Sequence, residues 1–103
     1  MELKNKMEAI LKERKGLNIN DDYGIEKCWN EMTILLTQNE DETIDYLNEC
    51  NEENLYYISE IFEDISEQLQ SKRFITCLRN LDKKFPKLDM TKDIDIAESY
   101  IGN

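Results

Sequence analysis

The stretch Asn51–Leu69 reads NEENLYYISEIFEDISEQL and carries the clearest structural signal in the chain. Its apolar residues recur three or four positions apart, at Leu55, Ile58, Phe62, Ile65 and Leu69. This spacing is that of one face of an α-helix. Asn51 is a suitable N-cap, and Glu52 and Glu53 follow in the first turn, where the helix dipole favours negative charge. The stretch therefore predicts one amphipathic helix with a buried apolar stripe.

The opposite face of this helix is harder to explain. The stretch holds six carboxylates and no Lys or Arg. Glu60 and Asp64 are like charges at i and i+4, and such a pair destabilises a helix by about 0.2–0.5 kcal/mol. Glu63 and Glu67 repeat the arrangement. Helix stability therefore does not account for these residues.

The same helical spacing extends outward through the rest of the chain. Further helices are predicted at residues 2–14, after a cap at Asp21 or Asp22, after the capping-box pair Asn39 and Glu42, between Ser71 and Pro86, and after a cap at Thr91. The chain has only three glycines and one proline, too few for a loop-rich β protein. We therefore expect one all-α domain over residues 1–103, with five to six short antiparallel helices as stacked αα-hairpins or a small bundle.

The net charge of −10 is concentrated in the middle of the chain. Residues 28–71 hold twelve Asp and Glu side chains and no Lys or Arg, whereas the flanking segments are nearly neutral. A field of this sign repels nucleic acid and anionic membranes, and it speeds encounter with a basic protein. We expect a protein partner with a basic surface, no nucleic acid and no membrane. The charge pattern leaves the oligomeric state open.

The sequence offers few groups for catalysis or metal binding. It has no histidine, the commonest general base and metal ligand. Cys28, Cys50 and Cys77 lie far apart without C-x-x-C spacing, and we expect buried, reduced thiols. The aspartates after residue 88 alternate like the start of a calcium loop, but Ile94 stands where that loop needs glycine. We therefore expect no enzyme activity, no cofactor and no metal. With no signal-peptide pattern and no apolar run of about 18 residues, we expect a cytoplasmic protein.

The carboxylate face of the central helix is the predicted binding surface. A turn of about 100° per residue places Tyr56 and Tyr57 among the carboxylates rather than in the apolar stripe. Tyrosines ringed by charge are typical of interface anchors. If the preceding helix forms a hairpin with this one, its outer residues extend the same surface. The predicted contact residues are Glu53, Tyr56, Tyr57, Glu60, Glu63, Asp64 and Glu67, followed by Tyr46 and Glu49.

Residues 50–101 also resemble a known class of protein. The similar segments are ISEIFEDIS (58–66), QSKRFITCL (70–78), KKFPKLD (83–89) and DIDIAESYI (93–101). They resemble the C-terminal half of small acidic all-helical immunity proteins encoded beside bacterial polymorphic toxins, including those of contact-dependent inhibition. The resemblance implies a protein that needs no catalytic group and neutralises a cognate toxin domain by binding it. For a nuclease toxin, the expected case, carboxylates would occupy or flank the basic substrate groove.

Two other functions stay open at this point. An acidic regulatory adaptor, or a DNA-mimic inhibitor of a basic host protein, would use the same surface. Alternatively, the acidic face is only solvated, and the chain is a structural or oligomerisation module. For the binding functions we expect that reversing Glu60 and Asp64 to Lys abolishes partner binding while the chain stays helical.

Overall fold

The computed structural model describes residues 2–102, and every regular element in this range is a helix. The α-helices are α1 (Glu2–Gly16), α2 (Asp22–Leu36), α3 (Glu40–Glu49), α4 (Glu52–Ile58), α5 (Phe62–Leu69), α6 (Lys72–Lys84) and α7 (Thr91–Ser99). Two 3₁₀ turns, η1 (Ser59–Ile61) and η2 (Pro86–Leu88), join α4 to α5 and α6 to α7. The predicted all-α fold of short helices is therefore confirmed.

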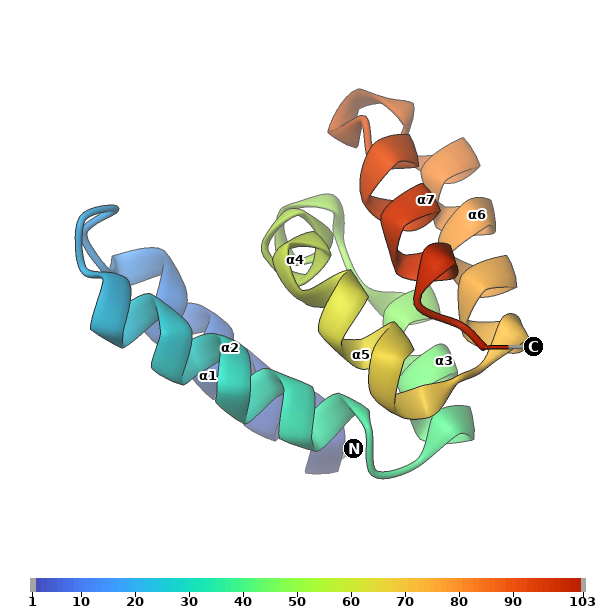
Figure 1. Cartoon of the computed structure of the whole chain (residues 1–103). Helices are drawn as coiled ribbons and strands as arrows, with labels where there is room; N and C mark the ends of the chain where they lie inside the picture. Colours follow the sequence, from blue (N-terminus) through green and yellow to red (C-terminus); the bar gives the residue numbers. More distant parts are fainter. Residues whose placement is uncertain (1, 103) are drawn as a thin grey trace.

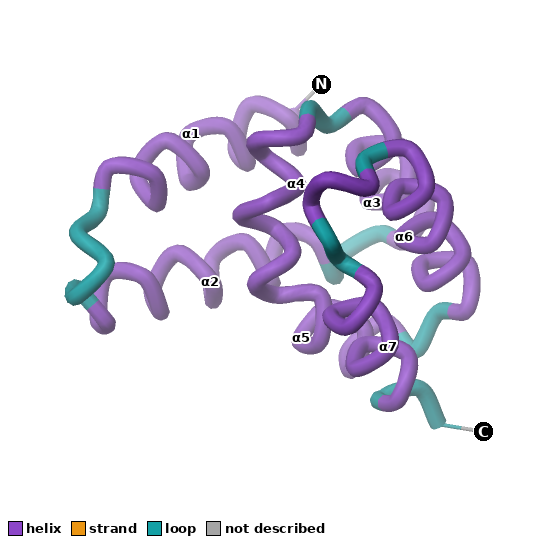
Figure 2. Tube along the Cα trace, turned by 90° about the horizontal axis from the view of Figure 1, so that it is seen from above, coloured by secondary structure: helices purple, strands orange, loops and turns teal. Residues whose placement is uncertain are grey.

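The helices form an arm and a body. Figure 1 shows α1 and α2 as an antiparallel hairpin on one side, with α3 to α7 gathered on the other. Seen from above in Figure 2, the loop between α1 and α2 lies at the far end of the arm. In the body, α5 packs against α7, and α6 packs against both α7 and α3. The resulting molecule measures 36 × 28 × 24 Å.

The apolar stripe of the central stretch forms the middle of the core. Leu55, Ile58, Phe62 and Ile65 are completely buried, and Leu69 is partly buried. The ring of Phe62 meets that of Phe74 on α6 edge-on, with centroids 6.4 Å apart. Such aromatic pairs contribute about 0.5–1.5 kcal/mol beyond the burial of their area. The central stretch thus gives the other helices a shared apolar surface.

This stretch is not the single helix that its spacing predicts. The 3₁₀ turn η1 separates α4 from α5, and the hydroxyl of Ser59 donates a hydrogen bond to the carbonyl of Tyr56 at 2.6 Å. Ile61, which the predicted stripe did not include, is completely buried. A 3₁₀ turn holds about three residues rather than about 3.6. The outer faces of α4 and α5 are therefore rotated apart.

Most of the predicted helix caps are confirmed. Side-chain oxygens of Asp21, Asn39 and Asn51 accept bonds from the backbone N–H groups that open α2, α3 and α4. Ser71, predicted only as a break between helices, caps α6 in the same way. The predicted Thr91 cap is wrong, since α7 begins directly after Met90. The Thr91 hydroxyl instead donates to the Asp82 carboxylate at 2.7 Å, which ties the start of α7 to the end of α6.

The cysteines give a prediction that chemical labelling can check. All three are free and buried, as expected from the sequence. Burial raises the pKa of the Cys50 thiol, and that of the Cys77 thiol, from 9.0 to about 11. Because only the thiolate reacts, native Cys50 and Cys77 should label about 100-fold more slowly at pH 8 than unfolded thiols. Equal labelling rates in native buffer and in urea would contradict this burial.

Candidate protein-binding surface

Arg14 of α1 lies at the centre of a polar junction between the arm and the body. It is 8% exposed and makes two parallel bonds to the Glu60 carboxylate, Nε to Oε1 at 3.0 Å and Nη2 to Oε2 at 2.8 Å. The indole N–H of Trp29 on α2 donates to the same Oε1 at 3.1 Å. The hydrogen bond to Glu60 raises the pKa of the Arg14 guanidinium above its ordinary value. Bidentate pairs of this kind are among the strongest polar contacts in proteins, so Glu60 joins α1 and α2 to η1.

Two more of the predicted contact residues take part in this junction. The guanidinium carbon of Arg14 lies 5.1 Å from the centre of the Tyr57 ring, and the Lys15 ammonium lies 5.9 Å from it. A cation within about 6 Å of an aromatic ring is attracted to its face. Lys15 also binds the carboxylate of Glu53 and the side-chain oxygen of Asn54. Helix α1 thus supplies basic partners that residues 28–71 lack.

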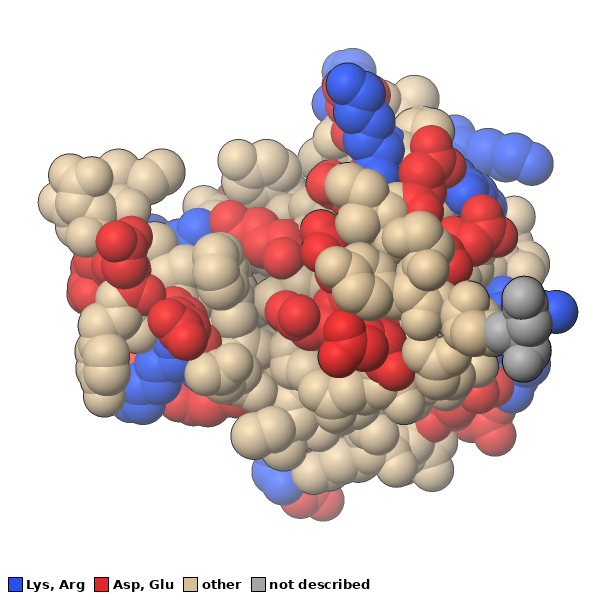
Figure 3. Space-filling model, in the orientation of Figure 1, with Lys and Arg blue, Asp and Glu red and all other residues tan. Residues whose placement is uncertain are grey.

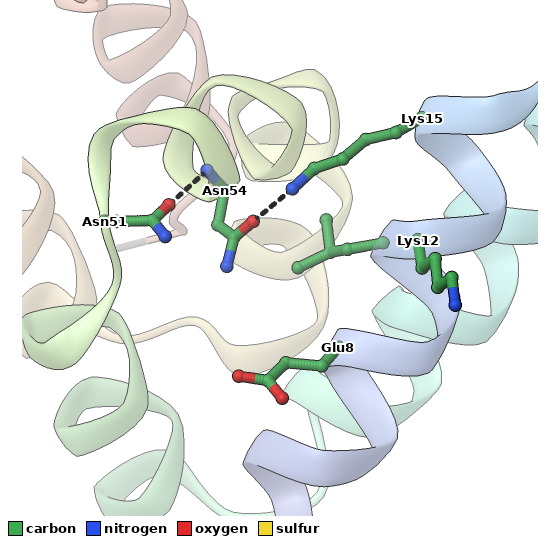
Figure 4. A pocket seen from close by; sticks show the side chains of 6 residues that line it. Glu8, Lys12, Lys15, Asn51 and Asn54 are labelled. Atoms are coloured by element: carbon green, nitrogen blue, oxygen red, sulfur yellow. Dashed lines mark hydrogen bonds between the residues drawn. The ribbon is translucent and has the colours of Figure 1, made fainter.

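A hollow of about 320 Å³ lies beside this junction, between α1 and the start of α4, and Figure 4 shows the side chains that line it. Lys15 reaches across it to Asn54, and Asn51 caps α4 at its edge. These polar groups are already used by the fold. The remaining charged side chains, Glu8 and Lys12, have opposite signs. The hollow therefore favours neither an anion nor a cation.

The expected outward position of Tyr46 is wrong. Tyr46 is 3% exposed, and burial raises the pKa of its hydroxyl. The buried face of α3 runs through Thr43, Tyr46 and Leu47. Thr43 can be buried there because its hydroxyl donates a hydrogen bond to the carbonyl of Leu36 at 2.8 Å. Glu49 is exposed as expected, but α3 packs chiefly on α6 and α1 rather than forming the expected hairpin with α4.

Three predicted contact residues remain free on α5. No ion pair within residues 2–102 includes Glu63, Asp64 or Glu67. Asp64 and Glu67 are exposed and Glu63 is partly buried. We call these three residues the α5 acidic face. Figure 3 shows acidic side chains gathered over the middle of the molecule, where Figure 1 places α5.

Tyr56 is the exposed member of the tyrosine pair. It is 55% exposed, and its ring meets that of Tyr57 edge-on, with centroids 5.2 Å apart. The Arg14 guanidinium packs over the ring of Tyr57, so Tyr56 contacts a ring whose position is fixed. Tyr56 is therefore exposed, as the sequence predicts, while Tyr57 serves mainly within the junction.

Helix α7 adds two exposed apolar residues that the sequence analysis missed. Ile96 and Tyr100 are each 43% exposed, and they stand one turn apart on the helix end that packs along α5. A signal for them was present, since both residues lie outside the stripe formed by Ile94 and Ala97. Side chains at i and i+4 are neighbours on a helix surface, so Ile96 and Tyr100 form one exposed apolar pair.

Within residues 2–102, no group of three or more His, Cys, Asp or Glu side chains is arranged to hold a metal ion. No helix in the same range has the length and apolar character needed to cross a membrane. Comparison with protein-family models, with curated proteins and with solved structures finds no match to this chain.

Proposed function

We propose that this chain is an immunity protein that binds and neutralises a cognate toxin domain through the α5 acidic face. The observation that carries the proposal is that Glu63, Asp64 and Glu67 are balanced by no ion pair within residues 2–102. Glu63 and Asp64 lie in the first turn of α5, where the helix dipole favours negative charge, but Glu63 and Glu67 repel each other at i and i+4. A basic partner would add attraction to all three carboxylates, and binding therefore explains why no Lys or Arg of the chain pairs with them.

The surface also has the composition that rapid and tight capture requires. Complementary charge raises the association rate above that of neutral surfaces. Tyr56 offers a rigid aromatic side chain with a polar tip, a residue type enriched among the dominant contacts of interfaces. A nuclease is the toxin class that fits best, because a groove that binds the phosphate backbone is lined with Lys and Arg. The resemblance of residues 50–101 to immunity proteins supports the same function.

Co-expression with the toxin domain encoded beside this gene tests the proposal. We expect the chain to restore growth and to co-purify with the toxin domain, and we expect the complex to weaken as salt is raised. A toxin domain from an unrelated gene pair serves as the control and should still kill. Undiminished killing in the presence of abundant folded chain, or the absence of any toxin gene beside this one, would contradict the proposal.

A further inference from the structure

Helices α5 and α7 form one continuous outer surface. They run parallel, since the hydroxyl of Ser66 donates to the carbonyl of Ala97 at 2.6 Å and the amide of Gln70 donates to the carbonyl of Tyr100 at 2.8 Å. The backbone N–H of Gly102 returns a bond to the Gln70 side chain at 2.7 Å. Figure 1 shows the two helices packed along each other. Their register is thus fixed along the contact.

The contacts of α6 determine which side of α7 meets α5. The buried stripe of α7 is formed by Ile94 and Ala97. Arg79 of α6 binds Asp95 and Glu98 at 2.8 and 2.9 Å, so α6 lies on the side of this stripe that carries these two carboxylates. At about 100° per residue, Ile96 and Tyr100 fall on the other side of the stripe. They therefore lie toward α5.

The same geometry places two carboxylates of α5 next to this pair. The Ser66 side chain faces α7. At about 100° per residue, Glu63 and Glu67 lie next to Ser66 around α5, on the side turned away from the core. Asp93 of α7 adds a partly buried carboxylate before Ile96, and burial together with the nearby charge of Asp89 raises its pKa. An apolar pair thus stands beside several negative groups.

We propose that Glu63, Glu67, Ile96 and Tyr100, the α5–α7 outer face, dock a basic amphipathic segment of the partner protein. In such a segment an apolar side chain lies between Lys or Arg residues. The apolar side chain packs on Ile96 and Tyr100, while the basic residues pair with Glu63 and Glu67. This inference rests on the proposed function and adds the chemistry of the partner segment.

Charge decides between this partner and the alternatives. A purely apolar segment would bury Glu63 and Glu67 without counterions, which is costly. A purely basic segment would leave Ile96 and Tyr100 uncovered. A second copy of the chain, packed face to face, would bring carboxylates against carboxylates. A segment that carries both basic and apolar groups satisfies every exposed residue of this face.

Two synthetic helical peptides test the inference on the purified full chain. The first has Leu and Lys at helical spacing, and the second has Gln in place of Leu. We expect the double variant Ile96→Ser, Tyr100→Ser to bind the Leu–Lys peptide at least about tenfold more weakly, measured by fluorescence anisotropy. Its affinity for the Gln–Lys peptide should not change, because that peptide uses only the carboxylates.

A matched variant on the arm controls for the loss of exposed apolar surface. Tyr23 and Ile34 of α2 are 81% and 60% exposed, and Tyr23→Ser, Ile34→Ser should leave the affinity for both peptides unchanged. A larger effect from the α2 variant would overturn the inference. Concentration-dependent self-association that the α7 variant abolishes, without peptide binding, would also overturn it. The assay needs no toxin, so its failure is distinct from a failure of co-expression to restore growth.

Discussion

Glu60→Lys is expected to lower the free energy of unfolding by about 3 kcal/mol, because it leaves a buried guanidinium without its partner. The side chain of Arg14 is 9% exposed and that of Glu60 is 26% exposed, so water replaces little of the lost contact. The indole N–H of Trp29 loses its acceptor at the same time. Domains of this size are stable by about 5–15 kcal/mol, so the loss is a large share of the total.

Asp64→Lys is the matched control for this prediction. It makes the same change of charge on the adjoining helix, but Asp64 is exposed and has no ion pair within residues 2–102. Because Asp64 lies in the first turn of α5, where the helix dipole favours negative charge, we expect the free energy of unfolding of this variant to fall by no more than about 1 kcal/mol. Urea unfolding followed by circular dichroism measures both variants. Equal midpoints for the two would show that the Arg14 junction does not hold the arm to the body. Glu60 is therefore a poor probe of binding, since its reversal also weakens the fold.

The double variant Asp64→Lys, Glu67→Lys should instead lose partner binding while the fold stays intact. We expect the affinity for the toxin domain to fall about 100-fold or more, since like charges facing each other across an interface cost several kcal/mol. Both side chains are exposed, so the urea midpoint should stay near that of the parent. Isothermal titration at two salt concentrations checks the affinity, and the parent should show the stronger salt dependence.

A second double variant separates the α5 acidic face from the overall charge. Asp45→Lys, Glu49→Lys reverses two exposed carboxylates on α3, which packs chiefly on α6 and α1. The net charge changes equally in both double variants. We expect the α3 variant to keep most of its affinity. An equal loss in the two would mean that net charge, and not the α5 acidic face, governs binding.

The parts of the fold that depend on neighbouring residues were predictable from the sequence. The apolar stripe and the caps at Asp21, Asn39 and Asn51 each involve residues within one or two turns of each other. Helical spacing and side-chain chemistry are sufficient to predict them. Thr91 was mispredicted because Asp82, brought near by the η2 turn, takes its hydroxyl.

The partners of the candidate contact residues were not predictable in this way. Arg14 lies 46 positions before Glu60 in the chain, and nothing in the local pattern of either residue indicates the pair. Tyr46 and Glu49 were placed together on the outside by their spacing, yet the packing of α3 buries the first and exposes the second. A charge count over residues 28–71 therefore shows the imbalance but not which carboxylates the fold neutralises.

We propose that a toxin domain is captured on the outer surface of α5 and α7, with Tyr56 of α4 as a further contact. Hydrogen exchange of the chain alone and in complex with the toxin domain tests it most directly, because it maps the covered backbone without any substitution. We predict slower exchange over residues 56–67 and 93–100, with α2 unchanged. Protection confined to the α1–α2 arm, with residues 56–67 exchanging as in the free chain, would contradict the claim.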